Sequence, residues 1–380
     1  MDVALPFSGI GFFLLSFASV AILLFCKHFL SSYIKYKYIL FSLIVVYIAF
    51  FLPFQATIGI LLFSLYIYLI YYVFSYSGYR KTLLPIVLVS LPMILFKLDV
   101  DGMYKIIGIS YITFRVIQAI SDQKNYGSLD FFEFTSYLFF PPTLLAGPID
   151  RSYRFKSDLD NGYANISTSN FVSGWELLVI GGLYKFVLAE FVAKFWLAEI
   201  DASSTSIVTM INSAYSYTLF FYFDFAGYSA MAMGVGIMLG ISVPRNFDKP
   251  YLAKNPQDFW RRFHITLGSW LTDYFFKPIY MYLQRFSYFR GRRLLVQNIS
   301  ITLTFLLMGM WNGLVWHYIF SGLLFGLYSS IHNCYVHYVR KGGTDIFSVT
   351  PNILSLCMKR LLMVNSVVLA LYVFSGRVPL

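Results

Sequence analysis

Long apolar runs recur along the whole chain, and short polar stretches separate them. A helix needs about 20 apolar residues to cross the hydrocarbon core of a bilayer. The first run follows Asp2 instead of a basic segment and is too long for a cleaved signal peptide, so we expect a membrane helix there. The runs cover Leu5–Cys26, Tyr38–Pro53, Ala56–Ser77, Leu83–Leu98, Phe132–Ala146, Phe171–Leu197, Ile207–Val243, Ile299–Phe325 and Leu361–Phe374.

The unequal lengths of these runs predict broken helices. Some are too short for a plain crossing, and others are too long for one. We therefore predict an all-α polytopic membrane protein with about ten or eleven membrane helices, several of them broken or re-entrant. Non-helical backbone at membrane depth is tolerated only where it is packed in protein or lines a cavity. This constraint points to a tunnel through the helices.

Composition and charge agree with a membrane protein. Hydrophobic residues make up 58% of the 380 residues and charged residues 12%, and the mean hydropathy is +0.66. A soluble chain carries roughly twice this charged fraction. The net charge is +11, but nothing beyond charge supports nucleic-acid binding. By the positive-inside rule the N-terminus faces outward and two basic loops are cytosolic; the residues concerned are Lys27, Lys35, Lys37, Arg80 and Lys81.

The stretch "NPQDFWRRFHITLGSWLTDYFFKP" predicts a helix over residues 256–276. Asn255 is a good N-cap, Pro256 suits the first helical position, and Pro278 stops the pattern. Asp258 and Arg262 form an i,i+4 pair with the acid first. In a continuous helix, one face would carry four residues: Arg261, His264, Gly268 and Leu271. The alternative for His264 is a core side chain satisfied by a backbone carbonyl, which is the commoner case for a lone histidine.

A single acid also interrupts an apolar run. Asp224 is the only charged residue between Asp201 and Arg245, so it must face protein or water and needs a partner. It is a candidate for a polar path, and a partner that holds a broken helix near Gly227 is an equal alternative. The segment 141–155, "PPTLLAGPIDRSYRF", predicts a cytosolic re-entrant loop with a structural role.

Other patterns indicate packing instead of chemistry. In "GVGIMLG" (Gly234–Gly240) no β-strand precedes the glycines, and small residues four apart let membrane helices approach closely. Gly309 and Gly313 repeat this spacing beside Asn312. The three cysteines have no metal-ligand spacing, and five histidines without an acidic cluster make a structural metal site improbable.

Several motifs together resemble the membrane-bound O-acyltransferase (MBOAT) family. They are the stretch from "YFDFAGYSAM" through "RNFDKP" to "RRFHITLGSW", together with "GISYITFRVIQ" (Gly108–Gln118), "AGPIDRSYRF" and the W-x-G of "MWNGLVWHY". The stretches "GPIDR" and "NFDKP" are most similar to the branch that D-alanylates teichoic acids. The resemblance covers most of residues 100–330, and the first hundred residues match only as generic membrane helices.

The resemblance implies a fold, a division of the chain and two site residues. The fold is a ring of helices around a tunnel, with N-terminal membrane helices in 1–100, the core in 101–340 and a last helix in 341–380. His264 matches the first functional residue of the family. Asn312 stands where the family has its second, a histidine, and an amide cannot take a proton near neutral pH. His317 lies five helical residues later, which turns its side chain about 140° away, so we interpret it as a polar packing residue.

The resemblance also implies partners and a location. A phosphopantetheine thioester on an acidic carrier protein would supply the acyl group, no cofactor would be tightly bound, and a hydroxyl of an envelope polymer or glycan would accept it across a bacterial cytoplasmic membrane. The basic clusters Arg261–Arg262 and Arg290, Arg292 and Arg293 are usually solvated cytosolic faces, and less often they dock an acidic protein or lipid headgroups. We take Arg290, Arg292 and Arg293 as the candidate dock for this carrier. Possible polar tunnel residues are Asp224, Arg261 and His317.

Two accounts of Asn312 remain open. His264 could be the base while Asn312 donates a hydrogen bond to the thioester carbonyl. Alternatively, the missing imidazole leaves a folded but nearly inactive protein, and we favour this account because a histidine there is the most characteristic feature of the family. The rivals to an enzyme are a scaffold that kept the fold and a transporter that uses Asp224; internal repeats common in transporters are not apparent in the sequence.

Overall fold

The computed structural model describes residues 7, 9–31, 33–52, 54–76, 83–98, 108–200, 205–348 and 351–378. Within these ranges the chain is built from helices, and β pairing is limited to an isolated bridge between Phe247 and Phe263. The predicted all-α class is therefore confirmed. Arg80 and Lys81, on which part of the predicted topology rests, lie outside the described residues.

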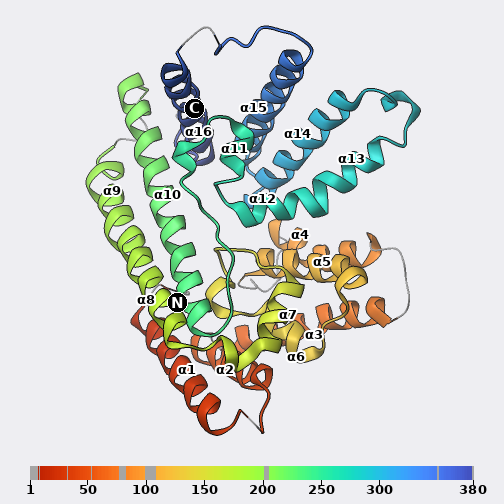
Figure 1. Cartoon of the computed structure of the whole chain (residues 1–380), viewed down its shortest axis with the longest axis vertical. Helices are drawn as coiled ribbons and strands as arrows, with labels where there is room; N and C mark the ends of the chain where they lie inside the picture. The colour runs from red at the N-terminus through yellow and green to blue at the C-terminus, as the bar shows by residue number, and fades with distance from the viewer. Residues whose placement is uncertain are drawn as a thin grey trace. The chain divides into compact units, whose positions relative to one another are not determined.

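The chain divides into two compact units, and helix α10 contributes to both of them. The first unit comprises residues 1–183 and 227–245, and the second comprises residues 184–226 and 246–380. The three-part division of the chain inferred from the sequence stays a prediction. Figure 1 labels the helices in chain order.

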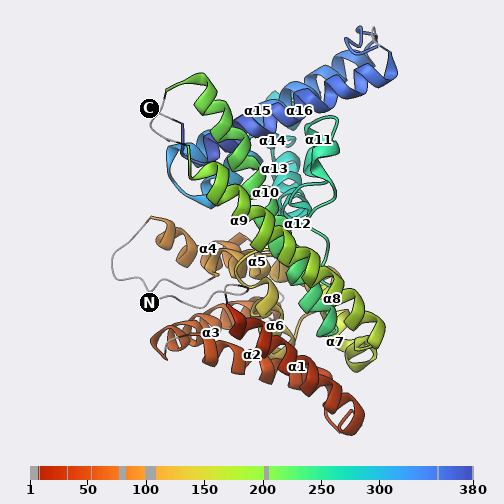
Figure 2. The same ribbon diagram turned by 90° about the vertical axis from the view of Figure 1, so that its left-hand side faces the viewer.

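The first unit holds the N-terminal helices, several short helices and the second half of α10. Figure 2 shows α1, α2 and α3 side by side. The elements are α1 (Ile10–Phe29), α2 (Tyr36–Phe51), α3 (Phe54–Tyr76), α4 (Leu83–Lys97), α5 (Ile109–Tyr126), α6 (Phe131–Leu138), η1 (Pro141–Thr143), α7 (Ser152–Asn161), η2 (Gly162–Asn165) and α8 (Thr168–Gly182).

The second unit begins with a helix interrupted by π-helical turns and ends with three long helices. Its elements are η3 (Leu183–Ala189), α9 (Glu190–Val192), η4 (Ala193–Leu197), the first half of α10 (Ile207–Met238), η5 (Pro250–Leu252), α11 (Pro256–Trp260), α12 (Ile265–Leu271), η6 (Thr272–Phe276), α13 (Lys277–Leu283), η7 (Ser287–Phe289), α14 (Arg293–Asn312), α15 (Trp316–Arg340) and α16 (Asn352–Phe374).

The outward surface of the long helices is apolar, as expected of helices that face lipid. On α1, Phe12 and Leu23 are buried, whereas Ile10 and Leu14 are 78% and 62% exposed. A helix that is apolar all round is buried in protein or in a membrane. Among the described residues, four helical segments are long and apolar enough to cross a bilayer: Ile10–Phe29, Thr57–Phe74, Arg293–Asn312 and Asn352–Phe374. Ten or eleven crossings and a central tunnel stay predictions.

Pairs of glycines bring α8 and the second half of α10 into backbone contact. A Cβ built on Gly234 would lie 2.5 Å from the carbonyl oxygen of Gly174, and one on Gly181 would lie 2.7 Å from that of Gly227. Both glycine pairs are seven residues apart along their helices, so they lie on one face of each. The prediction that the glycines around Gly234 serve close packing is confirmed.

Glycines also bring α14 and α15 into backbone contact. The two helices run side by side in Figures 1 and 2. A Cβ on Gly309 would lie 2.4 Å from the carbonyl oxygen of Tyr318, and one on Gly322 would lie 2.4 Å from that of Phe305. The close approach predicted around Gly309 is therefore confirmed. The helix breaks at Gly313, so the 140° turn between Asn312 and His317 inferred for a continuous helix is wrong.

We predict that Gly309→Ala destabilises the protein because the new methyl group meets the Tyr318 carbonyl and forces the two helices apart. Overpacking of this kind costs about 1–3 kcal/mol. The matched control is Gly59→Ala on α3, where a Cβ meets no atom within 4 Å. Thermal unfolding of both variants in detergent measures the difference, and an equal midpoint for both variants would contradict the proposed contact.

Candidate active site

The candidate site is built around a break between two short helices of the second unit. Helix α11 starts as predicted: the Asn255 side chain accepts a hydrogen bond from the Asp258 amide at 2.8 Å, and Pro256 takes the first position. The predicted pair of Asp258 and Arg262 is present at 2.9 Å. The helix stops at Trp260, so the predicted continuous helix over 256–276 is wrong.

Backbone pairing with a distant segment causes this break. The Asp248 amide donates to the carbonyl oxygen of Arg262 at 2.8 Å, and the Ile265 amide donates to that of Asn246 at 3.0 Å. Phe247 and Phe263 form the bridge between these two bonds. The chain then resumes as α12 and runs on without a gap through η6 into α13, so Pro278 does not stop the helix as predicted.

The break places His264 in an uncommon backbone conformation. His264 has φ 46° and ψ 50° and lies directly before α12, and Lys249, near the other side of the bridge, has φ 48°. A residue with a side chain pays roughly 1–2 kcal/mol in this left-handed region. Such strain persists where the surrounding structure fixes it, and it concentrates at functional sites.

The side chain of Asn246 determines which ring nitrogen of His264 carries the proton. One Asn246 atom, Oδ1, lies 3.3 Å from the Thr266 amide, 2.9 Å from Thr266 Oγ1 and 3.1 Å from His264 Nδ1. An amide N–H can only donate, so the atom it meets is the oxygen of Asn246. His264 Nδ1 must then be the protonated nitrogen, and Nε2 carries the lone pair.

Burial keeps this imidazole neutral. His264 is 6% exposed and Asn246 is fully buried. The ring of Phe225 meets the His264 ring edge to face, with centroids 4.7 Å apart. Burial lowers the pKa of His264 to about 3, and His264 lies outside the four candidate membrane spans. A neutral ring with its lone pair on Nε2 can accept a proton from a bound hydroxyl group.

Arg261 does not share the environment of His264. Arg261 is exposed while His264 is buried, because the turn at residues 261–264 removes the helical periodicity on which their common face was predicted. Gly268 stays within one helical turn of His264, and its amide donates to the His264 carbonyl at 3.0 Å.

Asp224 has a charged partner that was not identified from the sequence. Its carboxylate forms an ion pair with Lys185, which lies on the π-helical segment η3. Lys185 is the only charged residue between Glu176 and Glu190, so it stands alone in an apolar run as Asp224 does. Two isolated opposite charges in neighbouring runs are a usable signal for such a pair.

Asn312 and His317 lie on opposite sides of the Gly313 break. The Asn312 side-chain amide donates to the Met308 carbonyl at 2.9 Å, one turn back in α14. His317 lies in the first turn of α15, between the rings of Trp316 and Tyr318. A Cβ on Gly376 would meet the His317 ring at 3.3 Å. His317 thus packs at the end of the chain's last described helix.

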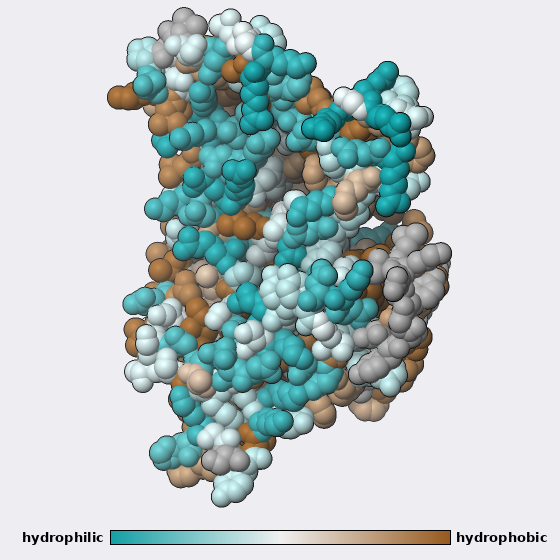
Figure 3. Space-filling model, turned by 45° about the vertical axis from the view of Figure 1, so that its right-hand side comes forward, coloured by the Kyte–Doolittle hydropathy of each residue, from teal (hydrophilic) through white to brown (hydrophobic). Residues whose placement is uncertain are grey.

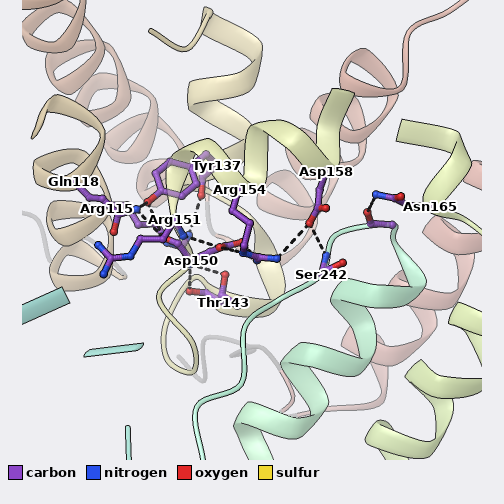
Figure 4. A network of polar contacts seen from close by, with 11 residues as sticks. Arg115, Gln118, Tyr137, Thr143, Asp150, Arg151, Arg154, Asp158, Asn165 and Ser242 are labelled. Atoms are coloured by element: carbon purple, nitrogen blue, oxygen red, sulfur yellow. Dashed lines mark hydrogen bonds and ion pairs between the residues drawn. The ribbon is translucent and has the colours of Figure 1, made fainter. Parts of the chain in front are cut away.

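The predicted re-entrant segment is held by a polar network in the first unit (Figure 4). Arg115 is buried and donates to the carbonyl oxygens of Tyr137 and Leu138 at 3.1 and 2.8 Å. Asp150 accepts from Arg154 Nε at 2.7 Å, and its carbonyl accepts from Gln118 at 3.0 Å. These contacts fix the non-helical backbone between η1 and α7, which is a structural role.

The network reaches a second turn of the same unit. Asp158 lies 3.6 Å from Arg154 and accepts from the Ser242 amide at 2.8 Å. Asn165 donates to the Gly240 carbonyl at 3.0 Å. Arg154 and Asp158 are four residues apart on α7 and therefore lie on the same face of the helix. This face connects the loop around Asp150 with the loop around Ser242.

Comparison with known proteins gives the family. The model of the membrane-bound O-acyltransferase family matches residues 75–375. The teichoic acid D-alanyltransferase of Streptococcus thermophilus is 30% identical over 333 residues, which are 81% of this chain and 80% of the relative. That of Bacillus subtilis is 30% identical over 276 residues, covering 71% and 69%. The peptidoglycan O-acetyltransferase of Helicobacter pylori is 38% identical over 216 residues, covering 56% and 39%. This multi-pass membrane protein therefore belongs to the membrane-bound O-acyltransferase family.

Proposed function

We propose that this protein transfers a small acyl or aminoacyl group from a carrier-protein thioester to a hydroxyl of a cell-envelope polymer or glycan. The observation that carries the proposal is the buried, neutral His264, whose lone pair is assigned to Nε2 by Asn246. The relatives named as D-alanyl- and O-acetyltransferases support an envelope polymer as acceptor. The protein would work in a bacterial cytoplasmic membrane, with its N-terminus outside.

The chemistry follows from a neutral base beside a thioester. His264 Nε2 takes the proton of the acceptor hydroxyl as its oxygen attacks the thioester carbonyl carbon. The new C–O bond forms the ester, the C–S bond breaks, and the imidazolium returns its proton to the thiolate of the carrier. The developing oxyanion needs a hydrogen-bond donor. Asn246 is a positioning residue in this scheme because it acts through His264.

We predict that Asn246→Ala slows single-turnover acyl transfer by about ten- to a hundredfold, the usual cost of removing the group that orients a functional histidine. Without the Asn246 oxygen, the proton of His264 can move to Nε2 and remove the lone pair from the reacting side. The readout is transfer from carriers loaded with either a D-alanyl or an acetyl thioester, because the relatives use both groups.

The conservative variant Asn246→Asp separates this role from a structural one. It keeps the acceptor oxygen and adds a negative charge, which raises the pKa of His264. Transfer needs the neutral ring and is lost as pH falls through this pKa, so the acidic limb of the pH profile should move to higher pH. If the acidic limb of the pH profile does not move and the variant only unfolds more easily, Asn246 has a structural role and the proposed positioning role is contradicted.

Asn312 stands where the family resemblance implies a second histidine. Its amide donates to a backbone carbonyl of its own helix and cannot take a proton near neutral pH. We infer that the chain works with one imidazole where the family resemblance implies two, and that transfer by this chain is slow.

We predict that Asn312→His raises the single-turnover rate by about 10²–10⁴-fold, the usual contribution of general acid–base catalysis, with carrier affinity nearly unchanged. Asn312→Ala is the matched control because it removes the amide without adding an imidazole. If the unmodified chain is fast and both variants are slower, Asn312 is instead a hydrogen-bond donor to the thioester. If no variant transfers while the carrier still binds, the protein is a scaffold with the family's fold.

The turn between α13 and α14 is the surface we propose for the carrier, and we call residues 281–293 the basic hairpin. Arg290, Arg292 and Arg293 are exposed, and the Arg292 guanidinium lies 4.4 Å from the centre of the Tyr288 ring. The surface drawn in Figure 3 is hydrophilic at the upper right, where this hairpin ends. Met281 and Tyr282, in the same segment, are exposed as well. A basic segment that also exposes apolar side chains suits an acidic carrier protein.

We predict that replacing Arg290, Arg292 and Arg293 together by Glu slows carrier association by about tenfold or more at low salt and flattens its salt dependence, because exposed charges mainly steer encounter. The control replaces the same three residues by Lys, which keeps the charge. Surface plasmon resonance at several salt concentrations measures both variants. Carrier kinetics that stay the same after the charge reversal would exclude the basic hairpin as the dock.

A further inference from the structure

A cavity of about 510 Å³ lies within the second unit. Its walls come from the first half of α10, from η5 and α11, and from α16, and these elements lie together in Figure 1. Volumes of roughly 300–1,000 Å³ are typical of ligand sites. None of the residues that line the cavity belongs to the basic hairpin or to the polar network.

The walls of the cavity are mainly hydrocarbon and aromatic. Met363, Val367 and Leu371 follow one another at four-residue spacing, so one face of α16 lines the cavity. The same helix turns another face outward, where Leu362 and Leu369 are 62% and 51% exposed. Helix α16 is also one of the four candidate membrane spans. The molecules that meet such a wall inside a bilayer are lipids.

The size of the cavity distinguishes a lipid chain from a protein helix. A cavity of roughly 150 Å³ holds one benzene ring of six carbon atoms, so about 510 Å³ has room for about twenty carbon atoms. A helix of roughly 10 Å diameter occupies about 400 Å³ per turn of 5.4 Å, so the cavity would hold only about one turn. We propose that the cavity binds one hydrocarbon chain of a membrane glycerolipid.

The position of the cavity relates this lipid to the candidate active site. Phe259 and Phe263 line the cavity and stack with ring centroids 5.0 Å apart. Phe263 directly precedes His264 and carries the backbone bridge to Phe247. A bound hydrocarbon chain would therefore contact Phe263, next to the turn that holds His264. At another wall, Tyr184 and Phe223 immediately precede Lys185 and Asp224, so an ion pair lies next to the apolar lining.

Photo-cross-linking tests the proposal on the full chain. The protein is reconstituted in phosphatidylcholine vesicles that contain a small fraction of phosphatidylglycerol with a diazirine on one acyl chain. After irradiation, mass spectrometry maps the labelled peptides. We expect labels on the cavity side of α16 and on α11, and we expect Val367→Trp to reduce them several-fold by filling the cavity.

Leu369→Trp is the matched control because it adds the same side chain to the exposed face of the same helix. It should leave the cavity labels unchanged. If Val367→Trp does not fold, the smaller change Leu371→Phe and the label positions in the unmodified chain still decide the question. Labels confined to outward residues such as Leu362, or cavity labels that survive both filling variants, overturn the proposal.

Competition identifies the source of the chain. Displacement of the label by excess unlabelled phosphatidylglycerol assigns the site to bulk phospholipid, whereas displacement only by a lipid-anchored envelope polymer assigns it to the anchor of an acceptor. If neither competitor displaces the label, the proposed lipid site is wrong. Binding is measured without acyl transfer, so a failure here leaves the proposed function standing, and a failure of transfer leaves this site standing.

Discussion

Backbone pairing between residues 246–248 and 262–265 is the constraint on which the candidate site depends. A helix end leaves amide and carbonyl groups without partners, and such groups are costly away from water. The bonds from Asp248 to Arg262 and from Ile265 to Asn246 meet this need on both sides of His264. The chain can therefore leave one helix and enter the next within four residues. The same pairing holds His264 in its left-handed conformation and brings the Asn246 side chain to Nδ1.

Charges within the apolar segments are matched in different ways. Asp224 has an ion pair with Lys185, Asp150 has one with Arg154, and Arg115 donates to several backbone carbonyls. A charge in an apolar environment needs partners of this kind, whether it is fully buried as Arg115 is or partly exposed as Asp224 is. The contacts of Asp224 account for its presence, which weakens the case for a transport path built on it. His264 differs from these residues because its polar partner orients a neutral ring.

The sequence predicts local features of this fold better than distant ones. The start of α11 at Asn255, the pair of Asp258 with Arg262 and the close contacts of Gly234 and Gly309 follow from short-range chemistry, and the structure confirms them. The break at residues 261–264 depends on pairing with a segment about 16 residues away, which helical periodicity does not contain. The role of Asn246 and the tautomer of His264 depend on the same distant pairing.

Helix α10 shows how side-chain size decides what the fold can hold. Its second half packs through Gly227 and Gly234, which allow backbone contact and leave no room for a ligand. Its first half carries large side chains, among them Leu219 at the cavity and Phe225 against His264. Large aromatic side chains keep helices apart, whereas glycines let helix backbones meet. Close backbone packing in the second half thus follows from its glycines, and the aromatic environment in the first half from the large side chains at the cavity and at His264.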